Sequence, residues 1–219
     1  MHPLAVDVGI GAIPDTTLEL AEHLAPMVPS LRVVGTDVDP GRVAAARRTP
    51  RVRFVVADLV PPRLSPGLVR AFNLLRGFSP SAAEVALGRL RRALAPGGVL
   101  VEGTSDKRGG ILVTAVHRRD REGPVRLERV VFSLDVALGF APRMLRVRLP
   151  RTLRAQRRLD PFLDAWTQAW AATRPHRAIS TAARRAWFVA SAEHLAERWP
   201  IATDPWAWRH GYVAVPMTD

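Results

Sequence analysis

Short hydrophobic runs recur along the first hundred residues, each about as long as one β-strand. They cover residues 4–8, 31–37, 52–57, 68–75 and 99–103. Their nearly continuous apolar character is typical of strands that are buried on both faces. Because helix-like segments separate most of them, the pattern predicts an α/β fold with a doubly wound, mostly parallel sheet and right-handed crossovers.

Three helices are predicted between these strands. The first begins at Asp15, the second spans residues 39–48, and the third spans residues 79–95. Ser79-Pro80 and Asp39-Pro40 favour helix starts, since proline suits the first helical position. The third helix has an apolar face made of Ala83, Val85, Ala86, Leu87, Leu90 and Leu94. Residues 61–67 are rich in proline and too few for a full helix.

The second half of the chain has a different pattern. Residues 111–117 and 125–134 resemble strands, and the turn-forming residues between them predict an antiparallel hairpin. Helices are expected at 161–173 and 180–199, and a last strand at 208–215. We therefore expect an α/β core at residues 1–142 that includes the hairpin, and a basic, helical, tryptophan-rich extension at residues 143–219 that packs on it.

The charge is unevenly distributed. The 219 residues carry a formal net charge of +12, and Lys107 is the only lysine. Residues 117–158 hold twelve arginines and four acids, so this segment alone contributes 12 − 4 = +8. The arginines of the Arg143–Arg158 stretch form either a solvated helix and strand edge or a surface for phosphate-rich partners such as RNA.

Composition excludes several classes of chemistry. With no cysteine, the chain has no disulfides, thiolate metal sites or cysteine nucleophile. No apolar run approaches the length of a membrane span, and no secretory signal precedes the first strand. The cytoplasm is therefore the expected location. The histidines have no metal-ligand spacing, so no metal is expected.

A glycine turn follows the first predicted strand. Gly9 and Gly11 separate that strand from the first helix, and Asp7 lies two positions before Gly9. A strand, glycine turn and helix in this order bring bare backbone N–H groups close to a ligand. A carboxylate beside the turn disfavours a phosphate and favours a ligand with amines and hydroxyls.

Three further signals follow in order along the chain. Asp37 ends the second strand, Asp58 follows the third, and Pro96-Gly97-Gly98 leads into the fifth. The carboxyl ends of parallel strands share one edge, where ligands bind. There Asp37 can reach ribose hydroxyls and Asp58 can accept from an exocyclic amine.

Over roughly residues 4–103 these motifs resemble the class I S-adenosylmethionine-dependent methyltransferases, which have a Rossmann-like fold. The resemblance implies that Asp7, Gly9 and Gly11 line the methionine end of S-adenosylmethionine, that Asp37 binds its ribose and that Asp58 binds its adenine. The run from Val69 to Arg76, followed by Glu102 to Asp106, is similar to an uncharacterised group of bacterial methyltransferase-domain proteins, which implies no substrate.

A nicotinamide dinucleotide fold is the competing interpretation. Its fingerprint requires a third glycine where this chain has Pro14, and an acid about 20 residues on. Here Asp37 lies 28 residues after Gly9. The spacing favours the methyltransferase interpretation.

The resemblance also exposes two departures. Relatives of this fold usually carry a helix before the first strand, where it covers the cofactor. Either the start of this chain is misassigned or the cover comes from elsewhere. After the fifth strand there is no room for the usual crossover helix, which leaves residues 104–110 as a polar loop at the ligand edge.

Candidate catalytic groups are Asn73, Glu102 and Asp106. Methyl transfer from a sulfonium needs a base only if the acceptor atom carries a proton. Glu102 or Asp106 would be that base, whereas Asn73 would face the substrate from the end of the fourth strand. The substrate-side candidates are Arg70, Arg76 and Thr104. Either arginine could hold an acidic substrate, or pair with Glu102 and only organise the site.

The six tryptophans all lie between Trp166 and Trp208. Leu163, Trp166 and Trp170 recur at helical spacing, which favours a packing stripe over a stacking platform for bases. The predicted function is methyl transfer from S-adenosylmethionine, with a small-molecule acceptor favoured. An RNA acceptor and a non-catalytic binding protein with the same fold are the alternatives. The sequence does not indicate the oligomeric state.

Overall fold

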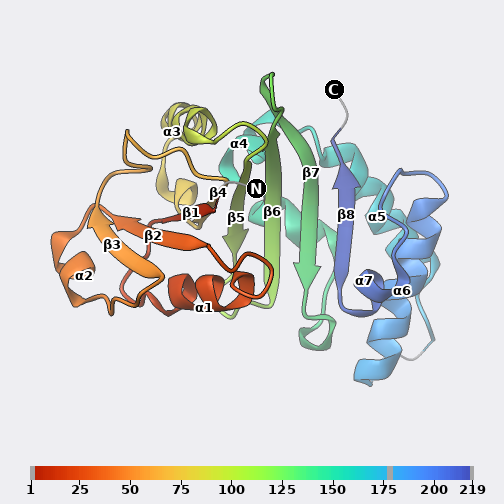
Figure 1. Ribbon diagram of the computed structural model, residues 1–219. Helices are drawn as coiled ribbons and strands as arrows, with labels where there is room; N and C mark the ends of the chain where they lie inside the picture. Colours follow the sequence, from red (N-terminus) through yellow and green to blue (C-terminus); the bar gives the residue numbers. More distant parts are fainter. Residues whose placement is uncertain (1–2, 177–179, 218–219) are drawn as a thin grey trace. The chain divides into compact units, whose positions relative to one another are not determined.

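A computed structural model describes residues 3–176 and 180–217 (Figure 1). The strands are β1 (Leu4–Val8), β2 (Arg32–Asp37), β3 (Val52–Val56), β4 (Leu68–Phe72), β5 (Val99–Ser105), β6 (Ile111–Arg119), β7 (Val125–Leu134) and β8 (Tyr212–Pro216). The helices are α1 (Asp15–Leu24), α2 (Pro40–Ala45), α3 (Pro80–Ala93), α4 (Arg151–Gln156), α5 (Asp160–Ala172), α6 (Thr181–Ala196) and α7 (Pro205–Arg209).

Within these residues the strands form a mixed sheet in the order β3-β2-β1-β4-β5-β6-β7-β8. The chain divides into two compact units. The first is Met1–Glu102 with His117–Arg126, and the second is Gly103–Val116 with Leu127–Asp219. The expected boundary after residue 142 does not coincide with this division, because the strands of the hairpin contribute to both units.

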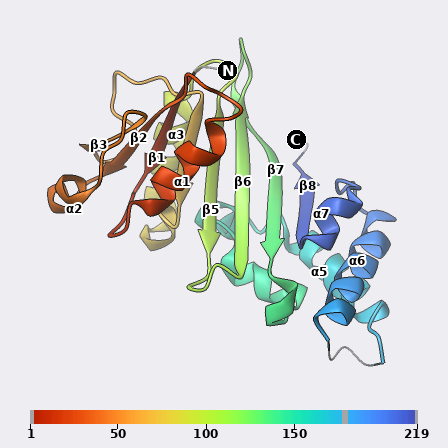
Figure 2. The ribbon, with the colours of Figure 1, turned by 60° about the horizontal axis from the view of Figure 1, so that its bottom comes forward.

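The first unit is a doubly wound sheet. β3, β2, β1 and β4 are parallel neighbours. Residues of α1 and α2, such as Leu18 and Val43, pack with Val33 on one face. Leu87 and Leu90 of α3 pack on the other face, and α1 and α3 lie on either side of β1 in Figure 2. Burial on both faces explains the continuous apolar runs, and the predicted fold class is confirmed.

Local signals explain where the helices of this unit begin. The Ser79 side chain accepts a hydrogen bond from the backbone N of Ala82 at 3.2 Å, and Pro80 follows it. Asp39 caps α2 in the same way through Gly41 and Arg42. These side chains satisfy N–H groups that the first turn of a helix leaves without partners.

The second unit has its own core. β7 and β8 pair antiparallel, and Phe132 from β7 packs against Phe162 and Trp166 of α5. Leu163 and Trp166 are buried, so the prediction of a packing stripe is confirmed for them. Trp170 stacks on Trp187 of α6 with ring centroids 3.8 Å apart. No helix among the described residues combines the length and the apolar character needed to cross a membrane.

Three predicted boundaries and one predicted burial up to residue 105 are wrong. β4 ends at Phe72 rather than Leu75, because Asn73 has a positive φ of 57° that no strand accommodates. α2 ends at Ala45 rather than Arg48, since the next residue is extended. β5 continues to Ser105, so the polar loop after it begins at residue 106. Val85 is exposed and not part of the apolar face of α3.

The predicted last strand also began too early. Trp208 belongs to α7, and β8 starts only at Tyr212. The Asp204 side chain accepts hydrogen bonds from the backbone N of Trp206 at 2.9 Å and of Ala207 at 3.2 Å. Asp204-Pro205 is thus a helix start that the sequence itself contained.

Candidate functional site

The edge formed by the carboxyl ends of β1, β2 and β4 is the candidate site. β1 pairs with β2 on one side and with β4 on the other. The chain therefore runs outward from β1 to β3 and returns to the opposite side of β1 at β4. This reversal is the topological switch point at which open α/β sheets bind ligands.

The glycine turn after β1 is pinned to the end of β2. The backbone N of Gly9 and that of Ile10 donate to the Thr36 carbonyl oxygen at 2.8 Å and 3.1 Å. Gly9 and Gly11 have positive φ values of 76° and 68°, a conformation that suits glycine. A Cβ on Gly9 would lie 3.1 Å from Leu74, whereas one on Gly11 would meet nothing within 4 Å. The turn is packed at Gly9 and open at Gly11.

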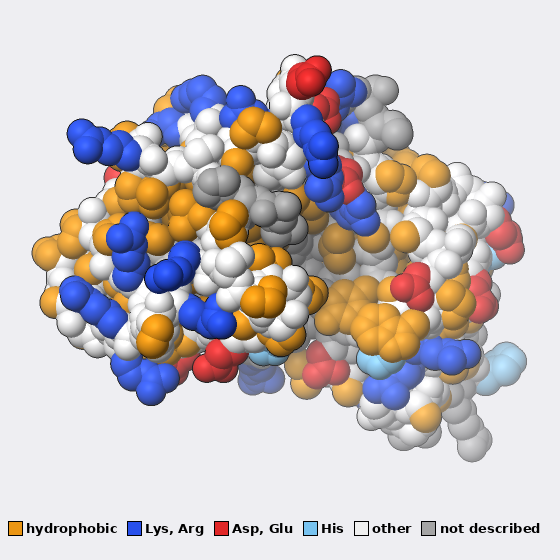
Figure 3. Space-filling view, in the orientation of Figure 1, with side chains coloured by type: hydrophobic (Ala, Val, Ile, Leu, Met, Phe, Trp, Pro, Cys, Tyr) orange, Lys and Arg blue, Asp and Glu red, His pale blue; other side chains and the backbone are white. Residues whose placement is uncertain are grey.

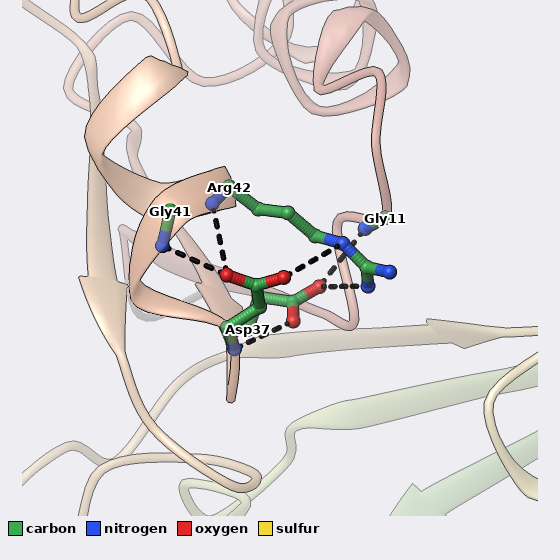
Figure 4. A network of polar contacts seen from close by, with 5 residues as sticks. Gly11, Asp37, Gly41 and Arg42 are labelled. Atoms are coloured by element: carbon green, nitrogen blue, oxygen red, sulfur yellow. Dashed lines mark hydrogen bonds and ion pairs between the residues drawn. The ribbon is translucent and has the colours of Figure 1, made fainter.

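Asp37 connects this turn to the start of α2 (Figure 4). Its Oδ2 accepts a hydrogen bond from the backbone N of Gly11 at 3.1 Å, and its Oδ1 accepts one from Asp39 N at 3.0 Å. Arg42 Nη1 lies 3.5 Å from Oδ2. Asp37 is buried, so the network holds a carboxylate in place beside the open part of the glycine turn.

Asp7 is engaged by two side chains of the protein. Arg70, its register partner on β4, donates from Nε to Oδ1 at 2.8 Å and from Nη2 to Oδ2 at 2.6 Å. The buried Thr17 hydroxyl of α1 donates to the same carboxylate. A bidentate arginine fork is the strongest common form of such a pair. The network fastens α1 to β1 and β4. Thr17, a polar residue on the buried face of α1, was not identified from the sequence.

Asp58 lies in the loop after β3 and is more than half exposed. Its Oδ2 accepts from Arg89 Nη1 of α3 at 2.6 Å. The two side chains line a cavity of about 340 Å³ whose other walls include Leu59, Phe78 and Val85. Residues 61–67 form no helix, as predicted, so the flank of α3 is uncovered there.

Asn73 and Arg76 follow β4. Arg76 Nη1 donates to Asn73 Oδ1 at 3.3 Å. The predicted pairing of Glu102 with Arg70 or Arg76 is wrong, because the contacts of Arg70 are to Asp7 and that of Arg76 is to Asn73.

Glu102 lies instead in a buried polar cluster beneath α3. It is two residues from Leu100 on β5 and so shares the face of the strand on which Leu100 packs against α3, and it is only 2% exposed. Arg91 Nη2 of α3 lies 3.1 Å from His117 Nδ1 of β6. Among the described residues, Glu102 Oε2, His117 Nε2 and Arg91 Nε have no hydrogen-bond partner. Arg91 and His117 were not anticipated, since the contact joins residues 26 apart.

Burial determines the charge states in this cluster. It raises the pKa of Glu102 to about 8, opposed by the nearby Arg91 cation and assisted by Glu84. It lowers the pKa of His117 to about 3, with a further contribution from Arg91. Burial also lowers the pKa of Arg91. Glu102 therefore holds its proton at neutral pH, which makes it a poor base, although its catalytic role remains a prediction.

Thr104 and Asp106 belong to the second unit. Thr104 is buried in β5. Asp106 accepts a hydrogen bond from the backbone N of Ile111 at 3.3 Å and donates its own N–H to Ile111 O at 3.0 Å. Both contacts close the β5–β6 turn. The substrate and catalytic roles expected for these two residues remain predictions.

The arginine-rich segment is partly neutralised within its own unit. Arg146 pairs with Asp160 at 3.4 Å and with Asp164 at 3.0 Å. Arg157 pairs with Asp160 at 2.8 Å, and Arg154 donates to the Val147 carbonyl oxygen. Within residues 3–176 and 180–217, no group of three histidines or acids is arranged to hold a metal ion.

The relatives found by comparison with known proteins agree with the resemblance that the motifs predict. No family model matches the chain. The chain is 39% identical over 110 residues to demethylmenaquinone methyltransferase of Thermus thermophilus, which covers 44% of this chain and 50% of that protein. It is 38% identical over 107 residues to trans-aconitate 2-methyltransferase of Variovorax paradoxus, covering 47% and 39%. These matches confirm the predicted resemblance to methyltransferases. The chain spans half or less of the length of these relatives.

Solved structures give a looser likeness. An amino pentose methyltransferase from Micromonospora echinaspora, with S-adenosylmethionine bound, is 24% identical, with 60% of this chain and 59% of that one covered and a TM-score of 0.37. Human N-acetylserotonin methyltransferase is 20% identical, with 49% and 31% covered and a TM-score of 0.38. Such scores carry no conclusion about this chain.

Proposed function

We propose that the chain binds S-adenosylmethionine at the edge of β1, β2 and β4 and transfers its methyl group to a small-molecule acceptor. One observation carries the proposal. The glycine turn, open at Gly11, lies beside the buried Asp37 carboxylate at the topological switch point.

The residues present suit this cofactor. Gly9 and Gly11 let the backbone approach a ligand closely. Asp37 Oδ2 accepts from Gly11 N and from Arg42 Nη1, whereas Oδ1 accepts only from Asp39 N. Oδ1 therefore retains a lone pair that can accept from a ribose hydroxyl. When bound, the cofactor supplies an already activated methyl group, so the protein contributes mainly positioning.

Two of the proposed contacts require rearrangement or sharing. Asp58 is paired with Arg89, and it would have to exchange or share this partner to bind adenine. Asp7 already accepts three hydrogen bonds, which leaves one lone-pair position for the methionine amine. We therefore place more weight on Asp37 than on Asp7 or Asp58.

The names of the relatives favour a small acceptor. One relative is named for demethylmenaquinone and another for trans-aconitate, and neither name refers to a macromolecule. An RNA acceptor is the alternative that the Arg143–Arg158 stretch motivates, and the pairing of Arg146 and Arg157 with acids reduces its free charge. Binding to bulk RNA that weakens steeply between 50 and 200 mM salt would favour RNA.

Calorimetric titration with S-adenosylhomocysteine tests the proposal. The native chain should bind it, and D37A should weaken binding by about 10- to 100-fold, since a charge-assisted hydrogen bond contributes about 1.5–3 kcal/mol. D58N should weaken binding less. D164N, which removes an exposed carboxylate in the second unit, is the matched control and should leave the affinity unchanged.

Failure of the native chain to bind, with a normal unfolding transition, would refute the proposal. Equal binding by D37A would refute the placement of the ribose. Cofactor binding without methyl transfer to any of a panel of small nucleophiles would favour the non-catalytic alternative.

A further inference from the structure

Arg76 is a cation without a carboxylate partner at the candidate site. It is exposed, and in the described ranges its contact is the neutral side-chain oxygen of Asn73 at 3.3 Å. No acid among the described residues pairs with it. A planar guanidinium with unused donors matches the geometry of a carboxylate.

The backbone at Asn73 brings the segment that precedes Arg76 close to the glycine turn. Asn73 has a φ of 57°, a left-handed conformation that asparagine tolerates better than most residues. β4 stops there, and Leu74 turns toward Gly9, where its Cδ1 lies 3.1 Å from the position of a Cβ. A short 3₁₀ helix, Leu75–Gly77, then carries Arg76. Such strain concentrates at functional sites.

The carboxylates of this unit that the sequence placed at the site are engaged or buried. Asp7 is paired with Arg70, and Asp37 accepts hydrogen bonds from two backbone N–H groups. Glu102 is almost completely buried beneath α3. An acceptor that arrives without a proton on its attacking atom needs none of them as a base.

We propose that the acceptor is a small carboxylic acid, that one of its carboxylates pairs with Arg76, and that a carboxylate oxygen receives the methyl group. The inference rests on the proposed function. A lone pair of that oxygen forms the O–CH₃ bond while the methyl–sulfur bond breaks and leaves its electrons on sulfur. The sulfonium becomes a thioether, the carboxylate becomes a neutral ester, and no proton moves.

The charge balance of the protein favours such an acceptor. Basic side chains clearly outnumber acidic ones on the visible face that carries α1, α2 and β3 (Figure 3), and the formal net charge is +12. A surface of one sign raises the encounter rate with ligands of the opposite sign. Asn73 would act as a positioning residue, since it orients the guanidinium through Oδ1.

The test is calorimetric titration of the full chain, saturated with S-adenosylhomocysteine, with citrate, succinate and the neutral dimethyl succinate. The native chain should bind at least one of the two acids and not the diester. R76Q should weaken that binding at least 10-fold, and R76K should restore part of it. N73G, which keeps the positive φ without the amide, should weaken it severalfold. R92Q removes another exposed arginine and should change nothing.

A second readout identifies the methylated atom. With labelled S-adenosylmethionine and a panel of organic acids, an ester product should release methanol in mild alkali, whereas an ether or N-methyl product should not. Absence of S-adenosylhomocysteine binding would overturn the proposed function itself. If that binding is intact, then failure to bind either acid, equal binding by R76Q, or an alkali-stable product would overturn only the present inference.

Discussion

The buried Glu102 predicts an unusual dependence of stability on pH. Its pKa is about 8 in the folded protein and about 4.5 in a solvated chain, and that of His117 is about 3 rather than 6.5. Between pH 4.5 and 6.5 the folded state carries the Glu102 proton and the unfolded state carries the His117 proton. The two effects cancel, so this pair contributes no slope in that range.

Above pH 6.5 the cancellation ends. The unfolded state has released both protons, whereas the folded state retains the one on Glu102 until about pH 8. The folded state therefore binds more protons, and stability falls as pH rises. Over these 1.5 pH units the free energy of unfolding should fall by about 2 kcal/mol, since one unit corresponds to about 1.4 kcal/mol.

Urea denaturation of the native chain and of E102Q at pH 5.5, 6.5 and 8 measures this effect. Glutamine imitates the protonated acid and cannot ionise. E102Q lacks this titration and should keep its stability between pH 6.5 and 8, so its stability relative to the native chain should rise by about 2 kcal/mol over that range. E19Q removes an exposed carboxylate on α1 and should track the native chain throughout.

H117Q provides an independent check of the cancellation. Without the unfolded-state titration of His117, the decline should begin near pH 4.5 instead of pH 6.5. A native stability that does not change between pH 6.5 and 8, or a decline that persists unchanged in E102Q, would refute the assignment of a buried, protonated Glu102.

Three further predictions concern other parts of the molecule. D7A should lower the free energy of unfolding by about 3 kcal/mol in urea titrations, because it leaves the partly buried Arg70 without its bidentate partner; a change below 1 kcal/mol would contradict the network. G9A should cost about 1–2 kcal/mol from the left-handed φ alone and should also weaken S-adenosylhomocysteine binding, whereas unchanged stability and affinity would show that the turn tolerates a side chain. W166A should lower the free energy of unfolding by about 3–5 kcal/mol, because the Trp166 side chain is fully buried. W206A should lower it by less than about 0.5 kcal/mol, because Trp206 is exposed. Thermal unfolding compares the two variants, and similar shifts of their melting temperatures would refute the packing argument.

The sequence by itself determined the local elements of this protein. Strand positions followed from short apolar runs, and helix starts from capping pairs such as Ser79-Pro80, because both depend on neighbouring residues. The same holds for the glycine turn and for Asp37 at the end of β2. The parallel direction of the first four strands followed from the alternation of elements.

Only the tertiary structure decided which side chains meet. Asp7 and Arg70 are 63 positions apart, and their pairing depends on β1 and β4 being neighbours in register. Val85 is exposed because the segment before β4 forms no helix to cover α3. Burial raises the pKa of Glu102 against the opposing charge of Arg91, and no local pattern in the sequence indicates that burial. The periodicity of a segment predicts the secondary structure of that segment alone, whereas contacts and charge states depend on segments that folding brings together.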